Sequence, residues 1–125
     1  MDIFVDTSVL VGTAFGEAGS ADLVARLRSA RTVFASTLLE AELQSACARE
    51  GLIVDARLLQ GISWVAPARP LSAELAKVLE AGYLRGADCW HLATAVYLAP
   101  NPADLVFLTL DRQQGDVAAR IGFSP

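Results

Sequence analysis

Lysine, cysteine and histidine are scarce in this sequence of 125 residues, and each scarcity bears on function. Lys77 is the single lysine, so arginine supplies the other positive charges, and the net charge is −4. Proteins that bind nucleic acid through a broad basic surface carry a clustered excess of Lys and Arg. That class is therefore not expected, although an acidic protein can still hold phosphates through bound cations.

The two cysteines, Cys47 and Cys89, lie far apart in the sequence and form no CxxC motif. The stretch Cys89-Trp90-His91 places a thiol near an imidazole, but the number and the spacing of ligands do not suit zinc. We therefore expect two buried, reduced thiols, which fits a cytosolic setting.

No stretch of this sequence has the length of a membrane span. The longest stretch without a charged residue runs from Cys89 to Ala103 and contains Pro100 and Pro102, whereas a spanning helix needs about 20 apolar residues. The first residues include Asp2 and no basic run, which argues against a signal peptide. We expect a cytoplasmic protein with no membrane segment.

Short apolar runs alternate with helical patterns along the chain. The runs are apolar throughout, as is typical of strands buried on both faces of a parallel sheet. Helix-start residues, glycines and prolines set the expected bounds of the helices. The expected strands are Ile3–Val5, Thr32–Ala35, Ile62–Val65 and Leu105–Leu110, and the expected helices are Ser8–Phe15, Ala21–Ala30, Thr37–Arg49, Val54–Gln60, Ser72–Ala81, Ala87–Leu98 and Arg112–Ile121.

The alternation of strands and helices predicts βαβ units, and hence an α/β fold with a parallel sheet covered by helices on both faces. The length and the 54% of hydrophobic residues favour one domain over residues 1–125. In open sheets of this class, ligands bind beyond the carboxyl ends of the strands.

Asp6 and Asp111 directly follow the first and last expected strands, at that end of the sheet. Taken singly, each is best interpreted as a helix N-cap, and Gln114 would complete a capping box with Asp111. Two caps that follow two strands of one parallel sheet would nevertheless meet at the same edge. The capping interpretation therefore itself predicts an acidic pair.

Two further carboxylates are expected near this pair. Glu42 borders the apolar stripe of its helix and needs a partner, whereas Glu40 points toward solvent. Asp88 lies at the start of helix Ala87–Leu98, where capping or an interaction with the helix dipole is the alternative role. The stripe beside Glu42 consists of Leu39, Leu43 and Ala46.

Two more residues have open roles. His91 follows Asp88 by about one helical turn, and we interpret it as a hydrogen-bonded helix histidine, with lining of the same acidic edge as the alternative. Asp116 is either a further ligand or supporting acid, or a surface residue of the last helix.

Four carboxylates in one cleft would not all stay ionised without compensation. Mg²⁺ and Mn²⁺ prefer carboxylate and water oxygens, and such a cation activates water and neutralises the charge on a phosphate under attack. The sequence has no GxxxxGK[ST] or GxGxxG motif, so nucleotide binding has no support. The residues therefore favour metal-assisted hydrolysis of phosphodiester bonds.

Four segments of the chain resemble, in order, the successive motifs of PIN-domain ribonucleases, and are most similar to those of VapC-type toxins. They are FVDTSVLV, STLLEAELQSA, LRGADCWHLATAVYL and FLTLDR, which together extend over nearly the entire chain. The resemblance implies a three-layer α/β/α fold with a short, mainly parallel sheet of four to five strands. It also implies Mg²⁺ or Mn²⁺ as cofactor, RNA as substrate, a homodimer, and a cognate antitoxin protein whose tail enters the active-site groove.

The resemblance also assigns roles to individual residues. Thr7 or Ser8 would supply the hydroxyl that supports the first aspartate, and Thr109 the polar residue before the fourth acid. Basic residues often flank the site in this family, and the candidates here are few: Arg85, Arg112 and Arg49. The implied catalytic residues are Asp6, Glu42, Asp88 and Asp111, and the implied metal ligands are Asp6, Asp88 and Asp111.

Three other functions match parts of this pattern. A haloacid-dehalogenase-like phosphatase needs a second aspartate two residues after Asp6, where this chain has Ser8. A phosphoacceptor receiver domain needs a lysine after a late strand, whereas Lys77 lies within an expected helix. A PIN-like module that holds RNA or a protein without cutting stays open, although four intact carboxylates favour an enzyme.

The expected helices also carry more apolar residues than one small core can hide, notably in TSVLVGTAF and SADLVARL. An apolar patch of this kind usually marks an interface, and a twofold homodimer is its commonest form.

Overall fold

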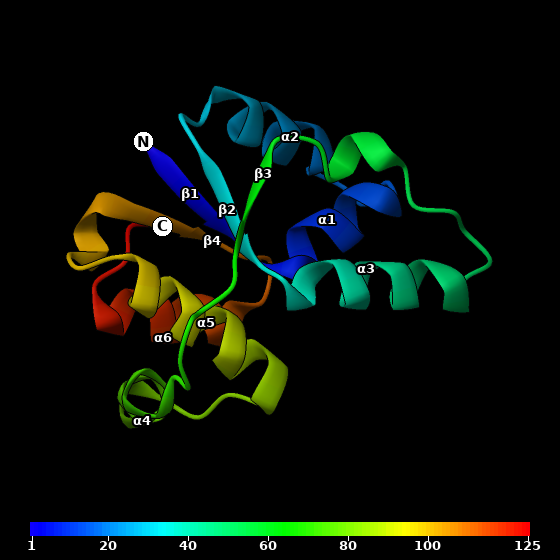
Figure 1. Cartoon of the computed structure of the whole chain (residues 1–125). Helices are drawn as coiled ribbons and strands as arrows, with labels where there is room; N and C mark the ends of the chain where they lie inside the picture. The colour runs from blue at the N-terminus through cyan, green and yellow to red at the C-terminus, as the bar shows by residue number, and fades with distance from the viewer.

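Four short parallel strands form the central sheet of the computed structural model, which describes residues 1–125 (Figure 1). Their spatial order is β3-β2-β1-β4, so the first and last strands of the sequence are neighbours. Since every pair is parallel, all carboxyl ends lie at one edge of the sheet. The strands are β1 (Asp2–Val5), β2 (Val33–Ser36), β3 (Ile62–Val65) and β4 (Leu105–Leu108).

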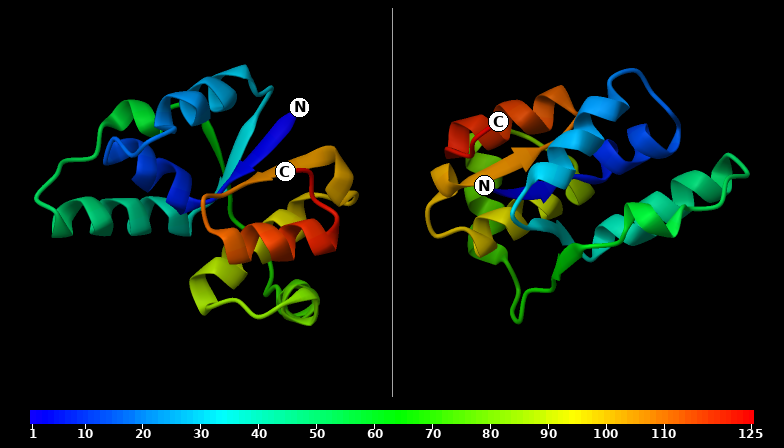
Figure 2. Two further views of the ribbon diagram at one scale, coloured as in Figure 1. Left: turned by 180° about the vertical axis from the view of Figure 1, so that it is seen from behind. Right: turned by 90° about the horizontal axis from the view of Figure 1, so that it is seen from above.

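Three helices cover each face of the sheet, which gives the three-layer α/β/α arrangement and confirms the expected fold class (Figures 1 and 2). One layer consists of α1 (Thr7–Ala14), α2 (Ser20–Ser29) and α3 (Leu38–Arg49). The other consists of α4 (Ser72–Ala81), α5 (Gly86–Leu98) and α6 (Arg112–Ile121). Two single turns of 3-10 helix, η1 (Ala56–Leu58) and η2 (Pro102–Asp104), complete the chain.

Strand β1 contributes to the core on both faces of the sheet because its side chains alternate. Phe4 packs into the core under α4, α5 and α6, where its ring stacks on Phe107 with centroids 5.8 Å apart. Val5 packs on the opposite side, in the core formed with α1 and α3. This packing on both faces fixes β1 against β4, and hence fixes the positions of the residues that follow them.

Three local expectations need correction. The helix expected over Val54–Gln60 is only the single turn η1, since its residues are mostly exposed and Gly61 follows in a left-handed conformation with φ of 78°. Strand β4 ends at Leu108 because Leu110 donates its backbone N–H to the Ser8 hydroxyl instead of to the sheet. In α3 the third fully buried residue is Cys47, not Ala46.

Both cysteines are buried and form no disulfide, as expected. None of the helices combines the length and the apolarity needed to cross a bilayer.

Candidate active site

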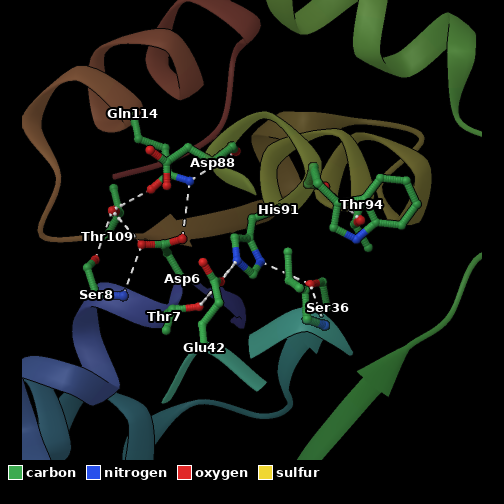
Figure 3. A network of polar contacts seen from close by, with 12 residues as sticks. Asp6, Thr7, Ser8, Ser36, Glu42, Asp88, His91, Thr94, Thr109 and Gln114 are labelled. Carbon is green, nitrogen blue, oxygen red and sulfur yellow. Dashed lines mark hydrogen bonds and ion pairs between the residues drawn. The ribbon is translucent and has the colours of Figure 1, made fainter. Parts of the chain in front are cut away.

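Three aspartates are brought to the carboxyl edge of the sheet by three different elements. Asp6 joins β1 to α1, Asp111 precedes α6 beyond β4, and Asp88 lies in the first turn of α5. The first two are neighbours because β1 and β4 are adjacent in the sheet. Figure 3 shows the Gln114 side chain linked by hydrogen bonds to both Asp6 and Asp88.

Asp6 is a buried carboxylate, 3% exposed, with a hydrogen-bond donor for each oxygen. Its Oδ2 accepts the backbone N–H of Ser8 at 3.1 Å, which caps α1 as the sequence predicted. Its Oδ1 accepts the side-chain amide of Gln114 at 3.2 Å. A buried charge needs such donors, since without them its desolvation would cost several kcal/mol.

Gln114 connects three parts of the site and is itself 0% exposed. Its Nε2 also donates to the backbone oxygen of Asp88 at 3.2 Å, and its Oε1 accepts the Thr109 hydroxyl at 2.7 Å. The expected capping box is therefore wrong: the backbone N–H of Asp111 donates to Thr109 Oγ1 at 3.0 Å, and the Gln114 side chain is used inside the site.

The hydroxyls beside Asp6 are arranged differently from the expectation that Thr7 or Ser8 supports this carboxylate. Thr7 donates to Glu42 at 2.8 Å, and the Ser8 hydroxyl lies 3.2 Å from Thr109 Oγ1, so neither contacts Asp6. Thr109 Oγ1 lies 3.3 Å from Asp6 Oδ2, but its one proton goes to Gln114, which is closer. Asp6 thus depends mainly on amide donors.

Asp111 caps α6, since its Oδ1 accepts the backbone N–H of Gln114 at 2.8 Å. Its Oδ2 makes no hydrogen bond within the protein. Because an ionised carboxylate has about four acceptor positions, capping leaves most of this acceptor capacity free.

The pKa of Asp88 reflects the negative charge that is concentrated at this site. Burial raises the pKa of its carboxyl group, and the negative charges of Asp6 and Asp111 raise it further, whereas Arg85 and His91 oppose the shift. Asp88 does not cap α5; the N-cap position belongs to Arg85, which makes no side-chain capping bond. Because the charges of Asp6 and Asp111 raise the pKa of Asp88, the three aspartates repel one another across the carboxyl edge.

Glu42 belongs to α3, is half-buried and lies near Asp6 in Figure 3. Its Oε1 accepts from the Thr7 hydroxyl at 2.8 Å and contacts His91 Nε2. The hydrogen bond from His91 lowers the pKa of Glu42 most, and Thr7 lowers it further, against the opposing effect of burial. Glu42 is therefore held as an anion at neutral pH.

The structure separates Glu42 from Glu40, as the sequence predicted. Glu40 accepts the side-chain amide of Gln44 at 2.7 Å on the exposed side of the helix, away from the site. Glu42 instead lines a groove of about 410 Å³ along α3, together with Arg49. A larger pocket of about 690 Å³ lies between α2 and the β2–β3 edge and contains none of the four acids.

The structure does not bring every candidate into the site. Asp116 is exposed on α6 and makes no side-chain hydrogen bond. Arg85 and Arg112 are exposed and form no ion pair, while Arg49 lies 3.3 Å from Glu50. The site is thus an acidic cluster with few cations at its rim.

Sequence reasoning missed one residue of this site and the role of another. Ser36, the last residue of β2, is fully buried and bonds to His91 at 2.9 Å. The strand-end rule that found Asp6 applies equally to Ser36, so this residue could have been found. The inward direction of Gln114 had no comparable signal.

The donor set of the site consists of carboxylate oxygens, which suit a hard divalent cation. As the side chains stand, no three acidic, histidine or cysteine groups converge in a geometry that would enclose a metal ion. No buried polar side-chain atom is left without a hydrogen bond. The acceptor positions that stay free belong to the carboxylates, as at Asp111, whose Oδ1 caps α6 while Oδ2 makes no hydrogen bond.

A family model described as PIN domain matches residues 3–120. No curated protein matches the chain.

Proposed function

The chain belongs to the PIN-domain family, and from that premise we propose that it is a metal-dependent endoribonuclease that hydrolyses RNA phosphodiester bonds. Family membership supports a nuclease, and so a hydrolase, in general terms. The observation that carries the finer proposal is the convergence of Asp6, Asp88 and Asp111 at the carboxyl edge of the sheet. Burial and the charges of the other two aspartates accordingly raise the pKa of Asp88. A cluster of this kind is relieved when a cation binds.

We assign the metal, Mg²⁺ or Mn²⁺, to Asp6, Asp88 and Asp111. Mg²⁺ keeps several waters and is commonly held by one or two carboxylates together with substrate phosphate oxygens. A set of aspartates that does not enclose an ion by itself therefore fits this mode of binding. When bound, the cation supplies charge neutralisation at the phosphate and activation of the attacking water.

The chain's own residues orient this site. Ser8 and Gln114 hold the Asp6 carboxylate from two sides, so its direction is set before any ligand arrives. Glu42 has a lowered pKa, which makes it a poor general base at neutral pH, because efficient bases have pKa values near the working pH. We assign to Glu42 the role of a fixed anion that orders water beside the aspartates.

Phosphate contacts in this proposal fall to the few arginines at the rim. Arg85 lies close enough to Asp88 to oppose its pKa shift. Arg49 lies in the groove that also contains Glu42. RNA would therefore lie along α3 toward the start of α5, held by bound cations more than by a basic surface.

We further propose that the protein is the toxin of a toxin–antitoxin pair, a homodimer that a cognate antitoxin inhibits. The four VapC-like sequence motifs support this role. The stretches TSVLVGTAF and SADLVARL do not supply the expected apolar patch, because most of their large apolar side chains lie in or against the core formed with α1 and α3. Support for an interface comes instead from other exposed apolar side chains, including Ile53, which is 96% exposed, and its neighbour Leu52. A second candidate, an inactive PIN-like binding module, would keep RNA or protein binding without cleavage.

The test is cleavage of a mixed RNA pool by wild type, Asp6→Asn and Asp116→Asn, with Mn²⁺ or with EDTA. Asp6→Asn keeps the shape of the side chain and removes the charge, so cleavage should disappear, as it should for wild type in EDTA. Asp116→Asn removes an equal charge from an exposed position and should cleave normally. Cleavage that survives both Asp6→Asn and EDTA would refute the metal mechanism, and binding without cleavage by wild type would establish the second candidate.

A further inference from the structure

His91 is the one histidine of the chain and has no place in the reaction as proposed so far. Its side chain is 0% exposed, on α5 beside the acidic cluster. Both ring nitrogens are occupied: Nε2 contacts Glu42 Oε1, and Nδ1 lies 2.9 Å from the Ser36 hydroxyl (Figure 3). An imidazole bonded at both nitrogens has one fixed orientation.

The ring joins elements that are distant in the sequence. Ser36 ends β2, Glu42 lies on α3 and Thr7 begins α1, and the ring reaches all three from α5. Thr7 Oγ1 lies 3.2 Å from His91 Nε2 and donates its proton to Glu42 Oε1. The Glu42 carboxylate is therefore held from two sides, by one hydroxyl and one imidazole.

A count of donors assigns the proton on the ring. An ionised Glu42 only accepts, so His91 Nε2 must carry the hydrogen that joins them. In the neutral ring, Nδ1 then accepts the Ser36 hydroxyl, whose oxygen in turn accepts the backbone N–H of Leu38 at 3.2 Å. Every buried polar side-chain atom has a hydrogen-bond partner in this arrangement. Nε2–H is present in both the neutral ring of this tautomer and the protonated ring, so the bond to Glu42 is the same in the two states.

We propose that His91 is a positioning residue for the nuclease, which holds the Glu42 carboxylate in the active site through Nε2–H and is itself held by Ser36. The inference rests on the proposed function, because Glu42 has a role to be positioned for only if the site cuts RNA. Glu42 is a flexible side chain that is only half-buried. Without His91, the Thr7 hydroxyl would be its only anchor.

The test compares three substitutions of His91. His91→Gln places an amide N–H near the position of Nε2 and can still donate to Glu42. His91→Asn places its amide near Nδ1 and reaches only Ser36, and His91→Leu reaches neither. The control is Thr94→Val, since Thr94 is a fully buried residue of the same helix whose hydroxyl only donates to the backbone oxygen of Trp90 at 2.8 Å.

Cleavage is measured on an RNA oligonucleotide that contains a site mapped with wild type in the mixed pool. A misplaced catalytic group costs on the order of 100-fold in rate, so His91→Asn and His91→Leu should lose about that factor in kcat, with KM little changed. His91→Gln and Thr94→Val should stay within about tenfold of wild type. Urea unfolding of each variant shows whether kcat follows stability instead.

If His91 only fills the core, its variants should rank differently in kcat. Its kcat losses would follow the losses of stability, with His91→Gln no better than His91→Asn, and that result overturns the proposal. Rescue by Gln alone, in variants of equal stability, supports it.

A second measurement does not require activity. Long-range ¹H–¹⁵N spectra of the ring should show the Nε2–H tautomer with a slowly exchanging proton, whose resonance moves in Glu42→Gln. The Nδ1–H tautomer, or no response to Glu42→Gln, overturns the assignment even if the protein cuts RNA. If wild type does not cut RNA but the spectra are as expected, the proposed function has failed, and with it the catalytic role, while the Glu42–His91 bond stands.

Discussion

Replacement of Gln114 by methionine should destabilise the protein far more than the same change at the neighbouring Gln113. Both residues lie in α6, and glutamine and methionine have similar helix propensity. Gln113 is exposed and donates only to the backbone oxygen of Tyr83 at 2.8 Å. The pair therefore isolates the effect of the buried hydrogen bonds of Gln114.

The size of the effect follows from the partners that Gln114→Met would leave behind. Asp6 Oδ1 would lose its donor inside the protein, and a hydrogen bond to a charged group contributes about 1.5–3 kcal/mol. Thr109 could turn its hydroxyl to Asp6 Oδ2 at 3.3 Å, so its loss would be small. Gln114→Met should therefore lower the free energy of unfolding by about 2–4 kcal/mol, against about 0.5 kcal/mol for Gln113→Met.

Urea unfolding followed by tryptophan fluorescence, in EDTA, measures both variants without any contribution from a bound cation. For a domain of this size the Gln114→Met loss corresponds to a fall in Tm of about 8–16 °C. A double-mutant cycle with Asp6→Asn should show a coupling of at least about 1 kcal/mol, because the two side chains are in contact. Equal losses at the two glutamines, or simple additivity with Asp6→Asn, would refute the view that Gln114 supports Asp6.

Three other outcomes are expected. Glu42→Gln should reduce cleavage on the order of 100-fold while Glu40→Gln is nearly silent, and equal losses in an RNA cleavage assay would mean that Glu42 has no special role. Asp88→Asn should stabilise the metal-free protein at neutral pH. The raised pKa of Asp88 means that the folded state binds more protons, so wild-type stability falls as pH rises from 3.8 through the folded pKa. In thermal melts, the higher stability of Asp88→Asn relative to wild type should therefore disappear below that pH range. Mn²⁺ should also stabilise the variant less than wild type. Identical melts of the two proteins would contradict this prediction. Light scattering at micromolar concentration should give twice the chain mass of 13.2 kDa, and a strict monomer would count against the homodimer.

Much of the fold was predictable because its signals are local. The expected bounds of Ile62–Val65, Ser72–Ala81 and Arg112–Ile121 agree with β3, α4 and α6. In each case a proline, a glycine or a capping residue lies close to an end of the element. The helix over Val54–Gln60 was over-predicted from its helical spacing. Val54 and Leu59 pack against the core only partly buried, which does not stabilise more than the single turn η1.

The candidate site was only partly predictable, because its acids and their partners depend on different information. Asp6 and Asp111 follow strands, and a parallel sheet brings such positions together whatever the details of packing. The bonds from His91 to Glu42 and to Ser36 span 49 and 55 residues, and they depend on how α5 is rotated against α3 and β2. No periodicity in the sequence specifies that rotation.

The sequence sets helix capping against metal binding as alternative roles for Asp6 and Asp111, and the hydrogen bonds show that the two roles are compatible. Each carboxylate uses an oxygen to accept a backbone N–H at the start of its helix, which fixes its orientation. Asp111 keeps Oδ2 free of protein donors, and each oxygen of Asp6 has further acceptor capacity. A cap also places the carboxylate at the positive end of a helix dipole, which favours the anion that a cation requires. Capping therefore prepares these two aspartates for a metal ion, and a loss of activity without loss of the fold in Asp6→Asn would separate the two roles.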